Sequence, residues 1–323
     1  MRIVSVFAGF VIILFCALPV QAQVIKDYTF SLCPQFGFLY GHAEEIVYPN
    51  PENKADLLSL LLWDMKPVFY YGLLMDFSPV KPFEKRGFFS GLSMKFGIPG
   101  PSGSMVDKDW QSVENAELTN FSSHDNAAEE IFILDFTAGV SFPFFKVLFV
   151  KTFVNVSYMK FRFSGENGYM IYARHLGGGK YAPIDEDPVK MSFNGKVISY
   201  NQEWFYAAPG VSAGYAYKDF LAEISFMITP FIFCADIDEH KNLNKQFMDN
   251  MRGGVMIEPG LRLSYIINGR LDISCELSWR YISGTRGPAY MRIPIGGGNY
   301  DPAGEAGAGM SILNTALLLK VRL

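Results

Sequence analysis

Apolar and polar residues alternate along much of this chain, and the stretch 271–281, LDISCELSWRY, shows the pattern most clearly. Its odd-numbered residues are apolar, and its even-numbered residues are polar. Strict alternation over this length predicts a β-strand with one apolar and one polar face. The same alternation recurs in 28–38, 132–142, 221–229 and 312–323. We therefore expect an all-β fold.

The apolar content of the chain limits the kind of all-β fold. Half of the 323 residues are hydrophobic and 15% are aromatic. After the first 22 residues, however, no apolar run approaches the roughly 20 residues that a membrane-spanning helix needs. The apolar side chains must therefore be removed from water in another way. The net charge is −4, and no basic block of the kind that binds nucleic acid is present.

The first residues predict export from the cytoplasm. Residues 1–22 begin with a basic residue, continue with an apolar segment over 3–18, and end in small residues, which is the pattern of a secretory signal peptide. No linker divides the remainder, so we expect a single domain over 23–323. The mature chain has three widely spaced cysteines, which imply no disulfide framework: Cys33, Cys234 and Cys275.

The connections between the predicted strands distinguish a membrane barrel from a soluble sandwich, which would alternate as well. The strands are long, and aromatic residues gather near their ends. Short connections on one side and long loops on the other are typical of an outer-membrane barrel, whose closed sheet pairs every backbone group within the bilayer. The short connections are 218–219 and 268–269, and the long ones are 99–129, 165–195, 237–252 and 285–305.

Ten antiparallel strands are predicted, and an even number is expected for a bacterial single-chain barrel. With the N-terminus in the periplasm, the turns are periplasmic and every long loop is extracellular. We expect the second strand to bend at Pro67. The predicted strands are 28–48, 55–77, 87–98, 130–143, 146–164, 196–218, 219–236, 253–268, 270–284 and 306–323.

Two acidic clusters lie in the expected second and fourth outer loops, at the same rim. One is MVDKDW, with Asp107 and Asp109, and the other is DIDEH, with Asp238 and His240. Each cluster alone is compatible with solvated surface acids or with weak calcium binding. The chain has no second histidine nearby and no His-Glu-x-x-His, so a zinc site is not expected.

Together the clusters permit a hydrolytic reaction without a metal. His240 can take a proton from water, while Asp238 fixes the tautomer of the imidazole and stabilises its charged form. Asp107 and Asp109 can share one proton, because adjacent carboxylates resist double ionisation. The pair would then hold the water and the developing oxyanion.

These motifs resemble those of the omptins, outer-membrane endopeptidases built on a ten-stranded barrel, and the resemblance extends over essentially the whole mature chain. It implies that Asp107 and Asp109 are the acidic pair of the family. It also implies that Asp238 and His240 are its Asp-His dyad. Ser123 and His124 are similar to a Ser/His stretch in the same loop of the family.

The resemblance also implies a specificity. Omptins favour cleavage beside basic residues, through a glutamate on the first strand and an aspartate two positions before the dyad. Glu45 and Asp236 stand at those places. Two carboxylates in one pocket would favour Lys or Arg, and the planar fork of a guanidinium favours Arg. The expected partners are thus polypeptides with Lys or Arg at the cleavage site.

A lipid site is implied less completely. Omptins bind lipopolysaccharide phosphates through basic residues on the outer wall, and Tyr158 and Arg162 match two positions of that site. Lys160 replaces a family glutamate, Glu203 an arginine, and Met248 a lysine. This altered charge puts any dependence on lipopolysaccharide in doubt, and we expect no other cofactor.

The leading hypothesis is a monomeric, aspartic-type endopeptidase in the outer membrane of a Gram-negative-type bacterium, with its site facing the exterior. A non-catalytic barrel acting as an adhesin or surface receptor is the alternative, and a small pore is the third.

The alternation itself predicts an irregularity near the second cluster. In 221–229 the odd-numbered residues are expected to face the lumen, whereas Asp236, Asp238 and His240 are even-numbered. The strand must therefore contain one extra residue between 229 and 236 if Asp238 and His240 are to face inward. Since proline is tolerated at bulges, we expect the break in 229–234, around Pro230.

Overall fold

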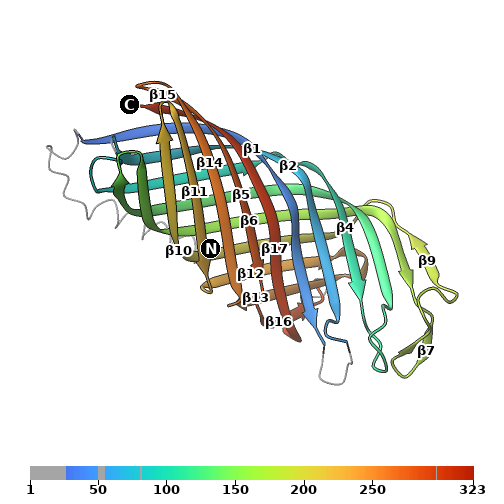
Figure 1. The fold of residues 1–323 in the computed structure, drawn as a ribbon. Coiled ribbons are helices and arrows are strands. Elements are labelled where there is room, and N and C mark those ends of the chain that lie inside the picture. Colours follow the sequence, from blue (N-terminus) through green and yellow to red (C-terminus); the bar gives the residue numbers. More distant parts are fainter. Residues whose placement is uncertain (1–26, 50–54, 81, 296) are drawn as a thin grey trace.

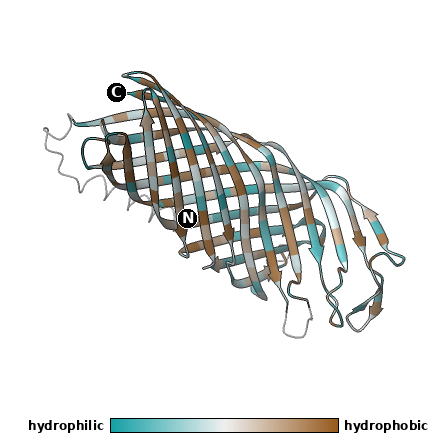
Figure 2. Ribbon diagram, in the orientation of Figure 1, coloured by the Kyte–Doolittle hydropathy of each residue, from teal (hydrophilic) through white to brown (hydrophobic). Residues whose placement is uncertain are grey.

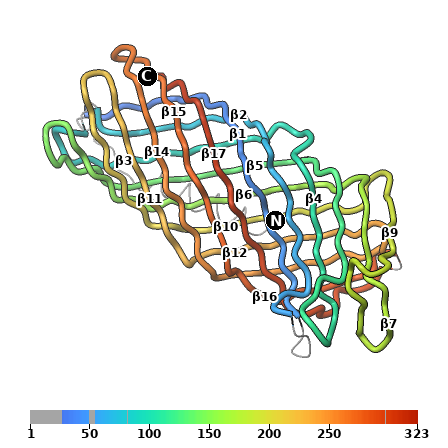
Figure 3. The backbone as a smooth tube through the Cα atoms, turned by 45° about the vertical axis from the view of Figure 1, so that its right-hand side comes forward, coloured from blue at the N-terminus to red at the C-terminus, as the bar shows by residue number. Residues whose placement is uncertain are grey.

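A computed structural model describes residues 27–49, 55–80, 82–295 and 297–323, and strands make up nearly all of this part of the chain. None of its helices is long and apolar enough to cross a membrane. The strands form one closed antiparallel ring, and if each interrupted strand is taken as one, the described residues contribute ten strands to it (Figures 1 and 3). The ring consists of β1 (Tyr28–Tyr48), β2 (Ser59–Pro79), β3 (Gly87–Gly97) with β4 (Gly100–Asp109), β5 (Asn120–Phe145), β6 (Leu148–Tyr172), β10 (Lys196–Tyr217), β11 (Phe220–Thr229) with β12 (Ile232–His240), β13 (Lys245–Arg252) with β14 (Val255–Asn268), β15 (Leu271–Ser283) with β16 (Gly287–Arg292), and β17 (Asp301–Arg322).

The first and last strands close the ring. Gly37 of β1 lies opposite Tyr70 of β2 on one side and Ala316 of β17 on the other. Closure leaves no free edge in the wall, so each strand finds hydrogen-bond partners on both sides. Three short strands and a 3-10 turn lie at the outer end: β7 (His175–Gly177), β8 (Lys180–Tyr181), β9 (Val189–Ser192) and η2 (Lys241–Leu243).

The direction of the alternation decides between barrel and sandwich. On β15 the apolar residues are the exposed ones, with Leu277 41% and Trp279 39% exposed, whereas Asp272 and Ser274 are buried. A soluble sandwich would bury the apolar face instead. The apolar side chains therefore face outward, toward lipid. Hydrophobic and hydrophilic residues alternate along the strands (Figure 2).

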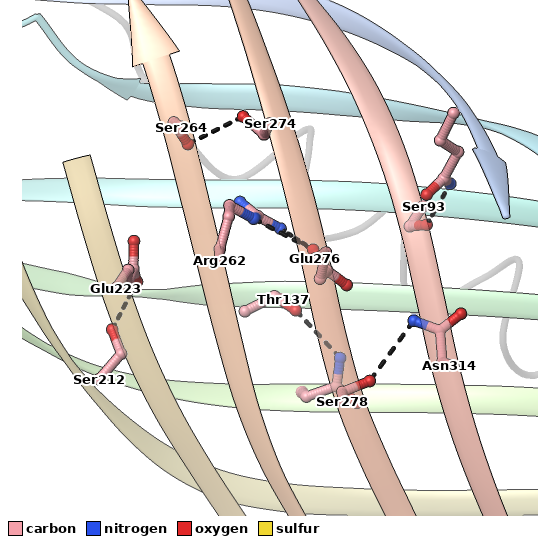
Figure 4. A network of polar contacts seen from close by, with 12 residues as sticks. Ser93, Thr137, Ser212, Glu223, Arg262, Ser264, Ser274, Glu276, Ser278 and Asn314 are labelled. Atoms are coloured by element: carbon pink, nitrogen blue, oxygen red, sulfur yellow. Dashed lines mark hydrogen bonds and ion pairs between the residues drawn. The ribbon is translucent and has the colours of Figure 1, made fainter. Parts of the chain in front are cut away.

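Polar side chains pair with one another in the half of the interior nearer the short turns (Figure 4). Arg262 donates to Glu276 at 2.6 Å, and Ser212 donates to Glu223 at 2.6 Å. Arg262, Glu276 and Glu223 line a cavity of about 220 Å³. The pairing offsets the cost of enclosing charges in the barrel.

Buried apolar side chains fill the next layer of the interior. On β10 the layer contains Trp204 and Tyr206, and on β6 it contains Met159 and Phe161. On β6 these residues stand between those that line the cavity, such as Asn155, and those at the outer end. A packed layer at this level is what a narrow ten-stranded lumen filled by side chains would show, and it does not resemble an open pore.

The break near Pro230 is present as predicted. Four steps along β10, from Tyr206 to Gly210, lie opposite five steps from Met227 to Ile232, so one residue is extra. Thr229 is buried, and beyond the break the buried residues are even-numbered, beginning with Ile232. The bulge therefore reverses the alternation, so that the even-numbered residues of β12 face inward. A similar register shift lies beside Pro67 in β2, where a bend was expected.

The expected positions of several loops were wrong. The loop predicted at 99–129 is mostly strand, because β4 continues to Asp109 and β5 begins at Asn120. The loop predicted at 237–252 is reduced to a turn between β12 and β13. Alternation of apolar and polar residues marks only the part of a strand that faces lipid, whereas the wall continues beyond the apolar band with polar residues on both faces. Both acidic clusters thus lie on strands rather than in loops. The predicted signal peptide, 1–22, lies outside the described residues.

Candidate functional site

Asp107 and Asp109 lie at the outer end of β4, on the inward face of the wall. Neighbouring strands hold both carboxylates: Ser59 Oγ of β2 donates to Asp107 Oδ1 at 3.1 Å, and Asn120 Nδ2 of β5 donates to Asp109 Oδ2 at 3.0 Å. Since each carboxylate accepts a hydrogen bond from a fixed strand, the pair is held in one orientation.

Asp238 and His240 lie at the outer end of β12. They are two residues apart on one strand, so both side chains point to the same face. His240 Nε2 lies 2.5 Å from Asp238 Oδ2. The Asp238 side chain is 2% exposed and that of His240 is 26% exposed, so the imidazole can be reached from solvent while its partner cannot. The ring of Phe247 packs edge-on against the imidazole, with centroids 5.5 Å apart.

The site lies beyond the apolar band of the barrel. Outward-facing residues of β6 and β10 are apolar lower in the wall, as with Val154 and Val211, and become charged at Lys160 and Glu203. Glu203 lies opposite Ala235, next to the first aspartate of β12. The acidic clusters are therefore outside the membrane-spanning part of the strands.

The two clusters come from opposite sides of the ring, yet each influences the other electrostatically. Burial and the charge of Asp109 raise the pKa of Asp107 to about 8. Burial would lower the pKa of His240, but the charges of Asp238, Asp107 and Asp109 outweigh it and raise that pKa to about 9. Burial also raises the pKa of Asp109, although Asn120 opposes the shift. Both clusters thus face a common volume at the outer end of the barrel.

Glu45 and Asp236 also face that volume. Both are buried, and Glu45 Oε2 and Asp236 Oδ1 lack hydrogen-bond partners. Asp236 Oδ2 accepts a hydrogen bond from the Tyr200 hydroxyl at 2.7 Å. Burial, followed by the charges of Asp238 and Asp236, raises the pKa of Glu45 well above its usual range. Glu45 comes from β1 and Asp236 from β12, so the two carboxylates approach each other across the interior.

A chain of side chains below the site was not predicted from the sequence. Trp204 Nε1 donates to Gln202 Oε1 at 2.8 Å, and Gln202 Nε2 donates to the Tyr200 hydroxyl at 2.9 Å and to the Glu44 carbonyl at 3.1 Å. The indole of Trp63 stacks on Tyr200, with centroids 5.2 Å apart. The even-numbered spacing of 200, 202 and 204 in one strand was the available signal. This spacing identifies a row of interior side chains only if the inward face of the strand is known.

Asp249 was missed as well. It lies on β13 directly opposite Asp236, is 2% exposed, and has one oxygen, Oδ1, without a partner. The sequence predicts a loop at 237–252, and a loop gives no cross-strand partner for Asp249.

Ser123 and His124 lie on β5, beside β4. His124 is buried and its Nδ1 contacts the carbonyl oxygen of Asn167, while its ring lies 5.9 Å from that of Phe193. Ser122, rather than Ser123, lies opposite Asp107. His124 therefore supports the wall next to the acidic pair.

Tyr158 and Arg162 lie on the outward face of β6, where acidic residues accompany them. The Tyr158 hydroxyl donates to Glu203 Oε2 at 3.0 Å, and Arg162 Nε lies 3.3 Å from Glu129 Oε2. Lys160 Nζ lies 2.8 Å from Glu130 Oε2. The charges of Lys160 and Arg162 on this wall are thus already balanced by acidic residues of the protein. No group of three or more His, Cys, Asp or Glu in the described ranges is arranged to hold a metal ion.

The family of this chain follows from a match to a family model, and known proteins resemble it in sequence and fold. The model of the Omptin family matches residues 26–319. The plasminogen activator of Yersinia pestis is 22% identical over 266 residues, which cover 81% of this chain and 80% of that protein. The crystal structure of the outer membrane protease OmpT from Escherichia coli superposes with a TM-score of 0.80 at 19% identity, covering 91% of this chain and 97% of the other. The chain belongs to the omptin family.

Proposed function

We propose that this outer-membrane protease of a Gram-negative bacterium hydrolyses peptide bonds with a water molecule activated between Asp107, Asp109 and the Asp238–His240 dyad. The observation that supports this most strongly is that β4 and β12 hold the two clusters at the same outer end of the interior, near enough for the charges of Asp107 and His240 to shift each other's pKa. Solvated surface acids would not be expected to face the same part of the interior from both β4 and β12.

The roles follow from the contacts. His240 Nε2 is engaged by Asp238, so Nδ1 is the ring nitrogen that can take a proton from water. Asp238 holds the ring and stabilises the imidazolium that forms. Asp107 and Asp109 share a proton, which allows one carboxyl to bind the water and to donate to the oxyanion as the carbonyl is attacked. The reaction is of the aspartic type and uses only side chains and water.

Cleavage would take place beside Arg or Lys. Glu45 and Asp236 are buried, and each has an oxygen without a partner, so a basic side chain would satisfy both. A guanidinium presents five donors in a plane and can bond carboxylates on two sides at once, which favours Arg over Lys.

The site would face the exterior of the cell, and the protease would act as a monomer. The turns 146–147, 218–219 and 269–270 are short and lie at the end of the barrel opposite the site, as periplasmic turns do. Substrates would then be polypeptides outside the cell.

The test is cleavage of a small library of internally quenched peptides by purified protein refolded in detergent, with and without lipopolysaccharide. The library holds a basic or a neutral residue at one position in a fixed context. We expect wild type to cleave the basic peptides and the His240→Ala variant to leave them intact. Binding of the peptides without cleavage by wild type would overturn the proposal in favour of a surface receptor.

A further inference from the structure

A third carboxylate, Asp249, stands beside the two that the family resemblance assigns to specificity. Asp249 and Asp236 occupy directly opposed positions on β13 and β12 and point to the same inward face. Like charges in directly opposed positions of neighbouring strands destabilise a sheet. The stability of the barrel wall therefore does not explain why Asp236 and Asp249 lie opposite each other.

The three carboxylates are buried and short of partners. Glu45, Asp236 and Asp249 are each at most 3% exposed, and each has one oxygen without a hydrogen-bond partner. Among the described residues, no Lys or Arg forms an ion pair with any of the three, although other buried acids of the barrel, such as Glu258, do have one. Burial and the charge of Asp238 raise the pKa of Asp249 to about 7. Glu45, Asp236 and Asp249 thus lack the basic partner that a buried acid such as Glu258 has.

The remaining oxygens are held in place. Tyr200 donates to Asp236 at 2.7 Å, and a backbone hydrogen bond from Tyr290 supports Asp249. The two aspartates also hydrogen-bond each other, with Asp236 as the protonated partner, so without a bound cation the pair shares one proton. Glu45 approaches from β1 on the other side, close enough for the charges of Asp236 and Asp249 to raise its pKa. Glu45 and the two aspartates thus face the same part of the interior from different strands.

We propose that Asp249 is a third carboxylate of the site that takes the basic side chain, and that it sets the preference for a guanidinium over an ammonium group. The proposal rests on the proposed function. A guanidinium can direct donors from its edge to the two aspartates and from its other side to Glu45. An ammonium group has three donors on one small centre and is more strongly hydrated, so it satisfies three separated carboxylates less well.

The decisive variant is Asp249→Asn, which keeps the size of the side chain and removes its charge. The matched control is Glu239→Gln, because Glu239 lies on the outward face of β12 and bonds Gln246 at 2.6 Å. Both variants and wild type are assayed on three peptides that differ only in having Arg, Lys or citrulline at the cleavage position. Citrulline has the shape of Arg without its charge.

We expect Asp249→Asn to lower kcat/KM on the Arg peptide by roughly 10- to 100-fold, the effect on the Lys peptide to be smaller, and the citrulline rate to be unchanged. Asp249→Glu should restore the preference for Arg. Glu239→Gln should leave all three rates unchanged. Folding is checked by heat-modifiable migration in detergent gels. If Asp249→Asn does not fold, the pair Asp249→Glu and Asp249→Gln provides the same comparison.

The outcomes separate the two proposals. A wild-type preference for Arg that is unchanged in Asp249→Asn would overturn the role of Asp249 alone. An equal loss on all three peptides would show a structural role and would overturn it too. Cleavage by wild type without any preference for Arg over citrulline would overturn the proposed specificity together with the role of Asp249, and absence of cleavage would overturn the proposed function.

Discussion

Asp238 Oδ2 lies 2.5 Å from His240 Nε2, two residues further along the same strand. Because the spacing is that of one strand face, the backbone alone brings the carboxylate to the imidazole, and no loop has to close. The strand itself therefore holds Asp238 and His240 in position for the reaction.

Loss of either side of the site should abolish cleavage. We expect His240→Ala and Asp107→Ala each to lower kcat by about 10²- to 10⁴-fold or more, since loss of a general base has that effect and misplacing the water adds to it. Rates on an Arg peptide measure the loss, and heat-modifiable migration shows that the barrel is folded. A variant that is folded and retains wild-type activity would remove its residue from the mechanism.

The pH dependence should be shifted to the alkaline side. The reactive form needs a neutral His240 and a shared proton on Asp107 and Asp109. His240 has its pKa raised to about 9 and loses its proton as pH rises through that value, whereas Asp107, with a pKa of about 8, loses its proton on the same rise. We expect a bell-shaped profile of kcat/KM with its maximum between about 8 and 9.

Asp238→Asn removes the charge that contributes most to the high pKa of His240, so the acid limb of the profile should move to lower pH while kcat falls. A maximum near pH 6 for wild type, or an unmoved limb in the variant, would contradict this assignment.

Glu45→Gln should lower the rate on Arg peptides and narrow the gap between Arg and neutral peptides, because one of the charges that face the guanidinium is lost. Glu44→Gln is the matched control, since Glu44 points outward and contacts His42 at 2.9 Å. If Glu45→Gln cleaves with the preference of wild type, Glu45 is not part of the specificity site.

Chelation should leave activity unchanged. The proposed reaction uses carboxylates, imidazole and water, so incubation with EDTA followed by removal of the chelator should not alter the rate on an Arg peptide. Inhibition that added zinc reverses would replace this mechanism with that of a metallopeptidase.

Lipopolysaccharide should change activity little, within about twofold, because Lys160 and Arg162 already face Glu130 and Glu129. The combined variant Glu129→Gln, Glu130→Gln leaves these bases without acids and should bind lipopolysaccharide vesicles more tightly than wild type. Strong activation of wild type by the lipid would refute this expectation.

The ring of strands could be predicted from the sequence because lipid imposes alternation on every strand that crosses it. The acidic pair and the dyad could be recognised as motifs, and the extra residue near Pro230 followed from parity. The extension of β4 and β12 beyond the membrane could not be predicted, since polar residues occupy both faces there and leave no alternation to detect. Asp249 and Tyr200 were missed for the same reason: their importance comes from cross-strand neighbours, which depend on register.

The extra residue between Met227 and Ile232 separates two stretches of one strand that differ in which residues face inward. A deletion of Phe231 would remove this extra residue and so exchange the inward-facing and outward-facing residues in the rest of the strand. Every catalytic side chain would remain in the sequence, but Asp238 and His240 would turn to the outer surface of the wall while the membrane-facing stretch stayed in place. Loss of a residue from the turn 241–244 would only shorten that turn. Within this strand, an insertion or deletion before the catalytic residues keeps Asp238 and His240 facing inward only if it comprises an even number of residues.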